Sequence, residues 1–200
     1  MKKHILALLA IMIMVGCKDN PVSEKIRETK ETVTSTTKAV NEITKMQDDI
    51  LELQKLTPLT NDELKTWLPD QINGMKRIAF KAGQAGMIQI SSIEATYVNE
   101  DKSKKFNINI IDGAGQVGAS AISGVRIMLT QDFEEEDENK TRKTVTKKGV
   151  KAIEEYRKIN NNSNIKFLED RRFYIEAKGT NMDIDETWDA INEMDVDDLT

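Results

Sequence analysis

Alternation of apolar and polar residues along residues 106–110 is the feature that most constrains the fold of this chain. Phe106, Ile108 and Ile110 alternate there with two asparagines. A period of two residues places the apolar side chains on one face of a strand and the amides on the other. One wet face is typical of antiparallel sheets, because strands of parallel sheets are buried on both faces. The pattern therefore predicts an antiparallel sheet at the centre of the fold.

Further strand patterns surround this segment and are separated by polar turns. Residues 88–98 precede it across a polar loop, so the two segments are expected to form a hairpin. The apolar parity changes between Ile90 and Ile93, which predicts a β-bulge. Five more segments have strand patterns and are bounded by turn residues: 75–80, 141–146, 150–156, 165–168 and 172–177. The chain thus predicts a meander of about seven strands.

Helical patterns occur at both ends and in the middle of this region. Thr60 and Glu63 have capping-box spacing, which predicts a short helix starting there. A second helix is expected after the glycines near residue 118. A third, at about residues 184–194, carries an apolar stripe behind the capping residue Asp183. The predicted fold class is α+β, an antiparallel sheet of about seven strands covered by helices.

The first residues of the chain have the pattern of an export signal. Two lysines precede an unbroken apolar run at residues 5–15, which ends at Gly16 and Cys17. A bilayer-spanning helix needs about 20 apolar residues, so this run is too short to span and fits a secretory signal at residues 1–16.

Residues 14–17, Met-Val-Gly-Cys, resemble a bacterial lipobox. The resemblance implies that Cys17 is lipidated and becomes the first residue of a membrane-anchored mature protein. An Asp at the second position of the mature protein would resemble an inner-membrane retention signal. This chain has Lys18 at that position, so outer-membrane anchoring is favoured. Whether the protein faces the periplasm or the cell surface stays open. The expected location is the cell envelope.

A long helical stalk is expected at residues 17–57, before a globular domain at residues 58–200. Ile26, Val33 and Val40 recur at steps of seven, which indicates an apolar stripe along one side of a helix. Such a stalk could pair with an envelope protein or with a second copy of the chain. The alternative is a flexible linker, because residues 32–37 are rich in threonine and serine.

Composition excludes several classes of function. Without residues 1–16 the chain has 27 basic and 34 acidic residues, a formal charge of −7, which disfavours nucleic acid as a partner. Its only histidine is removed with the signal, and Cys17 is its only cysteine. Histidine-dependent triads and the usual zinc ligand sets are therefore excluded. No catalytic residue, metal ion or cofactor is assigned.

Gly113, Gly115 and Gly118 spell GxGxxG, the spacing of a dinucleotide-binding turn. That function needs a buried parallel strand before the glycines, whereas the preceding strand has the pattern of an antiparallel one. We interpret them as packing glycines between a strand and a helix. Anion binding by free amides at this helix start remains an alternative.

Two acidic segments are interpreted as solvated. Residues 132–138 are expected to form an acidic loop rather than a calcium site, since contiguous acids lack the alternating ligands of a cage. Asp195, Asp197 and Asp198 are expected to lie in an exposed tail after the last helix.

The order of motifs over residues 59–199 resembles uncharacterised exported lipoprotein domains and, more distantly, PsbP-like α/β/α sandwiches. The motifs that carry this resemblance are WLP at residues 67–69, GMKR at 74–77 and IIDGAG at 110–115. They are structural motifs, so the resemblance implies a fold and no activity. The leading hypothesis is a membrane-anchored, non-enzymatic binding or interaction module. The alternatives are a carboxylate-dependent envelope hydrolase and dinucleotide binding at residues 113–118.

Overall fold

The computed structural model describes residues 41, 44–83 and 90–199. Cys17, the export signal and most of the predicted stalk lie outside the described residues. The chain divides into two units at residue 46, and the fold is that of the second unit, Met46–Thr200. None of the described helices is both long and apolar enough to cross a bilayer.

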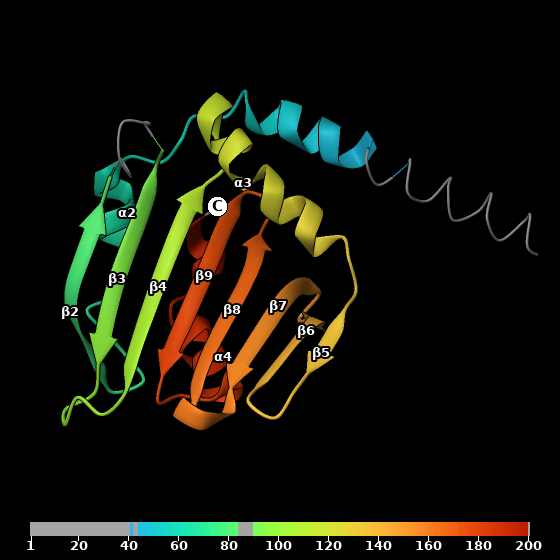
Figure 1. Ribbon diagram of the computed structural model, residues 1–200. Coiled ribbons are helices and arrows are strands. Elements are labelled where there is room, and N and C mark those ends of the chain that lie inside the picture. The colour runs from blue at the N-terminus through green and yellow to red at the C-terminus, as the bar shows by residue number, and fades with distance from the viewer. Residues whose placement is uncertain (1–40, 42–43, 84–89, 200) are drawn as a thin grey trace, which may run out of the picture. The chain divides into compact units, whose positions relative to one another are not determined.

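The described residues form a nine-stranded sheet in which every pairing is antiparallel (Figure 1). Its order is β1-β2-β3-β4-β9-β8-β7-β6-β5. The strands are β1 (Gln71–Ile72), β2 (Met75–Ala82), β3 (Ser92–Val98), β4 (Lys105–Asp112), β5 (Glu134–Glu136), β6 (Lys140–Lys147), β7 (Val150–Arg157), β8 (Asn162–Glu169) and β9 (Phe173–Thr180).

Two meanders meet at the centre of this sheet. β4 and β9 pair along their whole lengths, from Lys105 opposite Thr180 to Asp112 opposite Phe173. Helix α3 (Gly115–Leu129) leads the chain from β4 across to β5 at the far edge. The α+β class and the antiparallel sheet are therefore confirmed.

The sheet has two strands more than the sequence pattern predicted. β1 contains only two residues, too few to show a period. β5 lies inside the acidic run that was expected to be a loop. Its Glu134 and Glu135 pair opposite Lys143 and Arg142, and such cross-strand pairs of opposite charge stabilise a strand that composition alone disfavours.

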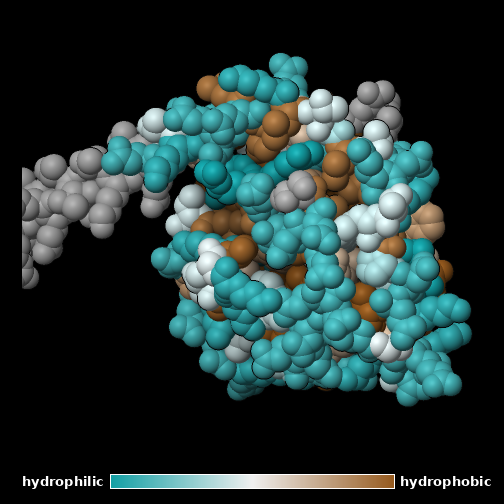
Figure 2. Space-filling view, turned by 180° about the vertical axis from the view of Figure 1, so that it is seen from behind, coloured by the Kyte–Doolittle hydropathy of each residue, from teal (hydrophilic) through white to brown (hydrophobic). Residues whose placement is uncertain are grey.

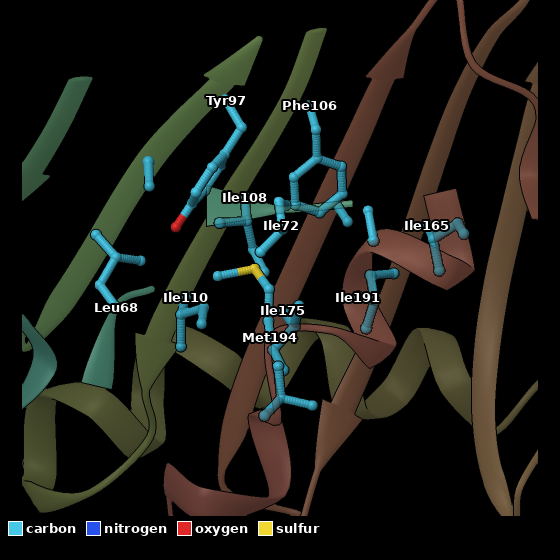
Figure 3. Packing of buried hydrophobic residues seen from close by; sticks show 14 of the residues in the cluster. Leu68, Ile72, Tyr97, Phe106, Ile108, Ile110, Ile165, Ile175, Ile191 and Met194 are labelled. Atoms are coloured by element: carbon cyan, nitrogen blue, oxygen red, sulfur yellow. The ribbon is translucent and has the colours of Figure 1, made fainter. Parts of the chain in front are cut away.

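One face of the sheet is covered by α2 (Asn61–Trp67), α4 (Ile184–Asn192) and the 3-10 helix η2 (Val196–Leu199). The apolar side chains of the alternating strands point to this side. Figure 3 shows Phe106 and Ile108 of the strands in one cluster with Ile191 and Met194. The main core of the protein therefore lies between the sheet and α4, which stands behind the sheet in Figure 1.

The other face is covered at one end only. Ala119 and Ile122 of α3 form a small buried cluster there with Leu53, from the helical residues 44–53. Ile50, from the same helical residues, packs against this cluster. The layers over this end are thus helix, sheet and helix.

Both predicted helix starts are confirmed by their capping geometry. Thr60 Oγ1 accepts from the N–H of Glu63 at 3.2 Å, and Glu63 Oε2 accepts from the N–H of Thr60 at 2.7 Å. These backbone and side-chain hydrogen bonds from Thr60 lower the pKa of Glu63. Asp183 and Glu186 form the equivalent pair at α4, at 2.8 and 3.1 Å.

One local prediction is wrong and another holds only in part. β3 begins at Ser92 and pairs with β4 in regular register, so Ile90 precedes the strand and no bulge follows it. The register shift lies in β2 instead. Asp195, Asp197 and Asp198 are exposed, as predicted, but the segment is not a free tail: residues 196–199 form the 3-10 helix η2, whose Val196 and Leu199 are buried.

Candidate functional site: a groove beside helix α4

The glycines of the GxGxxG sequence lie where β4 ends and α3 begins. The N–H of Gly113 donates to the carbonyl oxygen of Arg172 at 3.0 Å, and a Cβ on Gly113 would lie 2.6 Å from that oxygen. A Cβ on Gly118 would lie 2.5 Å from the carbonyl oxygen of Asp112. Gly115 has a φ of +76°, which favours glycine. At Gly113 and Gly118 a side chain has no space, which agrees with a packing role.

A carboxylate of the chain itself lies at this helix start. Asp112 is buried and accepts from the N–H of Ala114 at 2.9 Å and from that of Leu59 at 2.8 Å. Arg172 donates to it through Nε and Nη2 at 2.7 and 2.8 Å. This hydrogen bonding to Asp112 raises the pKa of Arg172. Of the amides at this helix start, those of Gly113 and Ala114 therefore already have partners within the chain.

The strand pairing also differs from that of a dinucleotide site. β4 lies between β3 and β9 and is antiparallel to both. The βαβ unit that holds a dinucleotide needs parallel strands, and none is found among the described pairings.

A groove of about 320 Å³ lies beside α4, bounded by β6, β7, β8 and η2. This volume is at the lower end of the range of roughly 300–1,000 Å³ for small-molecule sites. The apolar lining consists of Val150, Phe167, Trp188, Ile191 and Val196. The polar lining consists of Lys147, Lys148, Glu169, Asp185, Asp189, Asn192 and Asp197. On this side of the molecule, apolar surface shows only in patches between hydrophilic side chains (Figure 2).

Trp188 is held on two sides. The predicted apolar stripe of α4 turns it toward the sheet, where it is 8% exposed and its ring centroid lies 5.5 Å from that of Phe167. Its Nε1 donates to Oε1 of Glu154 at 2.7 Å. Glu154 of β7 is only 5% exposed, because it shares the core-facing side of that strand with Ala152. The indole is therefore fixed in orientation.

Lys147 brings a cation to the same point. Its Nζ lies 5.2 Å from the centroid of the Trp188 ring, within the range of a cation–π contact. The same Nζ is 3.7 Å from Oε1 of Glu154 and 3.4 Å from Oδ1 of Asp185. An aromatic face and two carboxylates thus converge on one ammonium group.

Glu169 lines the groove at the end of β8. Burial, with smaller contributions from Asp197 and Asp170, raises the pKa of its carboxyl group. It therefore keeps a proton to a higher pH than an ordinary glutamate does. General acid–base hydrolysis needs a second carboxylate with an opposite role across the substrate.

The sequence pattern placed Trp188 on the core face of the last helix but did not identify its partners Glu154 and Lys147. One signal was present: Glu154 stands two residues after Ala152, on the apolar face of its strand. A carboxylate in such a position needs a polar partner in the core. Which partner it has depends on the packing of α4 and could not be read from the sequence.

A second hollow, of about 650 Å³, lies on the other flank of α4. It is more open and has no aromatic side chain in its lining, and Lys104 and Glu186 form an ion pair at its edge. Within the described ranges, no three histidine, cysteine, aspartate or glutamate side chains are placed to hold a metal ion. The groove with Trp188 is therefore the candidate site.

Comparisons with known proteins add little to this description. No family model matches the chain. No curated protein matches it. A GTP-binding regulator from Thermotoga maritima is similar in structure over 68% of this chain and 84% of its own, at 11% identity and a TM-score of 0.32. A likeness at this level supports no conclusion about fold or function.

Proposed function

We propose that this protein is a lipid-anchored bacterial envelope protein whose globular domain binds a ligand without converting it. The groove beside α4 is the binding site. The observation that carries this proposal is the combination of an apolar, aromatic lining with an indole fixed by Glu154 and Phe167. Small-molecule and side-chain pockets typically have such a lining with a few polar groups that set orientation.

The anchor rests on the sequence at Cys17. An export signal followed by a lipobox-like junction supports lipidation, and Lys18 favours the outer membrane. Several acyl chains on one cysteine would hold the protein stably, because each buried methylene contributes roughly 0.8 kcal/mol. The layered fold is compatible with the exported PsbP-like sandwich domains that the motif order resembles. The stalk is the segment proposed to pair with an envelope protein or a second copy.

Hydrolysis is the second candidate function, and Glu169 is the observation that favours it. Its raised pKa suits a general acid, and it lines the groove. Binding is preferred because the groove is lined by apolar and aromatic side chains around an indole of fixed orientation, an arrangement that positions a ligand but that acid–base hydrolysis does not require.

Binding is tested by capture with a blocked-groove control. The mature chain is immobilised and incubated with an envelope extract, and retained molecules are identified by mass spectrometry. Asn192 lines both hollows, so Asn192→Trp would fill the groove from its rim and also narrow the second hollow, whereas Glu193→Trp places the same bulk in the second hollow alone. The proposal expects a molecule that the wild type and Glu193→Trp retain unchanged and Asn192→Trp loses. Hydrolysis would be favoured if the wild type yields a cleaved molecule and Glu169→Gln retains the same molecule intact.

The anchor is tested with Cys17→Ala in a bacterial host, by fatty-acid labelling and membrane fractionation. Loss of both label and membrane retention is expected in the variant. Protease added to intact cells then distinguishes the cell surface from the periplasm. A wild-type protein without lipid, or a variant that still fractionates with membranes, would refute the anchor.

A further inference from the structure

We infer that the ligand of the α4 groove carries a cationic group on an apolar stem, and that Lys147 occupies the place of this cation in the free protein. The inference rests on the proposed binding function of the groove and names the class of ligand. It follows from the surroundings of one atom, Nζ of Lys147.

These surroundings are those of a cation site. The ring of Trp188 lies below Nζ at 5.2 Å, and the carboxylates of Glu154 and Asp185 lie at 3.7 and 3.4 Å. Proteins recognise ammonium and guanidinium ligands with this combination of an aromatic face and neighbouring carboxylates. Lys147 satisfies the site from within the chain.

Lys147 can leave this position while the rest of the site stays. Its side chain is 39% exposed and stands at the end of β6, whereas the side chain of Glu154 is 7% exposed. Asp185, its other partner, is 89% exposed, so this contact is screened by solvent. Glu154 is the fixed charge, and a buried carboxylate requires a cation or a proton nearby.

The charge of the groove favours a cation in place of Lys147. Four carboxylates line it, from Glu169, Asp185, Asp189 and Asp197, against the two lysines. The second lysine, Lys148, donates to Oδ1 of Asn192 at 2.9 Å. Once Lys147 swings outward, an anionic ligand would meet an acidic lining, while a cation would restore the pairing of Glu154.

The apolar lining then accommodates the stem of the ligand. Val150, Phe167 and Ile191 offer apolar surface next to the cation position. An arginine or lysine side chain flanked by leucine in a peptide has the required chemistry, with a charged end and an apolar body.

The test uses the mature chain with Trp67→Phe, so that Trp188 is its remaining tryptophan. Fluorescence titrations compare three peptides, acetyl-Leu-Arg-Leu-amide and its citrulline and glutamate counterparts. We expect the arginine peptide to bind at least about tenfold more tightly than the other two, a difference of about 1.4 kcal/mol. Lys147→Met should tighten arginine-peptide binding severalfold, because it vacates the site. Lys151→Met, on the neighbouring strand β7 and outside the groove lining, serves as the matched control and should leave the affinity within about twofold.

Changes of affinity in the opposite direction would overturn the inference. If Lys147→Met weakens binding of the arginine peptide, Lys147 does not occupy the place of the ligand's cation. If the glutamate peptide binds more tightly than the arginine peptide, the groove prefers an anion. Absence of any fluorescence change with all three peptides, in the wild type and in Lys147→Met, also overturns it. The proposed function fails separately, when Asn192→Trp captures the same molecules as the wild type.

Discussion

The indole N–H of Trp188 donates to a carboxylate oxygen of Glu154 at 2.7 Å, across the interface between α4 and the sheet. Both residues are buried, and they lie 34 positions apart in the chain. The bond therefore holds α4 against β7 and sets the orientation of the ring that lines the groove. The stability of the domain and the geometry of the proposed binding site therefore depend on the same contact.

Trp188→Phe should lower the free energy of unfolding by about 2–4 kcal/mol. The change removes apolar contact and leaves a buried carboxylate without its best donor. Urea unfolding followed by circular dichroism measures the loss. Glu154→Gln is the control: its amide oxygen still accepts from the indole, so its loss should be smaller. If both variants lose the same free energy of unfolding, the hydrogen bond between Trp188 and Glu154 does not contribute as described.

Gly118→Ala and Gly124→Ala should change stability in opposite directions. A Cβ at Gly118 meets the backbone at 2.5 Å, and overpacking of this kind costs about 1–3 kcal/mol. A Cβ at Gly124, in the same helix α3, meets nothing within 4 Å. There, alanine should stabilise by up to about 1 kcal/mol through its higher helix propensity. The two melting temperatures provide the measurement, and a stable Gly118→Ala would refute the packing role of this glycine.

Asp112→Asn should be strongly destabilising, by about 3–5 kcal/mol, because it leaves the guanidinium of Arg172 without its buried partner. Asp62→Asn makes the same chemical change in an ion pair whose aspartate side chain is 93% exposed. That variant should lose less than about 1 kcal/mol. Chemical denaturation measures the free energy of unfolding of both variants. Similar losses would show that the buried ion pair of Asp112 with Arg172 stabilises the fold no more than an exposed pair does.

Tyr97 should make stability depend on pH in the alkaline range. Burial raises the pKa of its phenol from 10.0 to about 12, and its hydroxyl donates to the carbonyl oxygen of Pro69 at 2.8 Å. A raised pKa in the folded protein gives a contribution that is complete below pH 10 and is lost as the pH rises toward 12. The stability difference between wild type and Tyr97→Phe, about 1 kcal/mol at pH 8, should narrow above pH 10 and reverse in sign toward pH 11.5, because each pKa unit corresponds to about 1.4 kcal/mol. A constant difference would contradict burial of this phenol.

Local patterns predicted much of the fold. The alternation at Phe106 and Ile108 gave the central strand, and the spacing of Thr60 and Glu63 gave a helix start, because both depend on neighbours in the sequence. β5 was missed because its stability depends on lysine and arginine residues of another strand. Strand order was not predicted either: the pairing of β4 with β9 joins segments more than 60 residues apart.

The candidate site was predictable only in part. The stripe on the last helix identified Trp188 as facing the core. Its contacts with Lys147 and Glu154 bring together three segments, and the sequence carries no local sign of their convergence. The glycines at residues 113–118 attracted attention as a motif, yet their geometry is explained by close packing.

The most direct test of the binding proposal is the nuclear magnetic resonance signal of the Trp188 indole N–H. The chain has two tryptophans, and both indole groups are hydrogen-bonded, Trp67 to the carbonyl oxygen of Asp195 at 3.2 Å. Trp67→Phe assigns the two signals in the labelled mature chain. On addition of an envelope extract, the proposal predicts a shift of the Trp188 signal, an unchanged Trp67 signal, and no response in Asn192→Trp. An unmoved Trp188 signal, or equal shifts of both indoles, would contradict a ligand in the α4 groove.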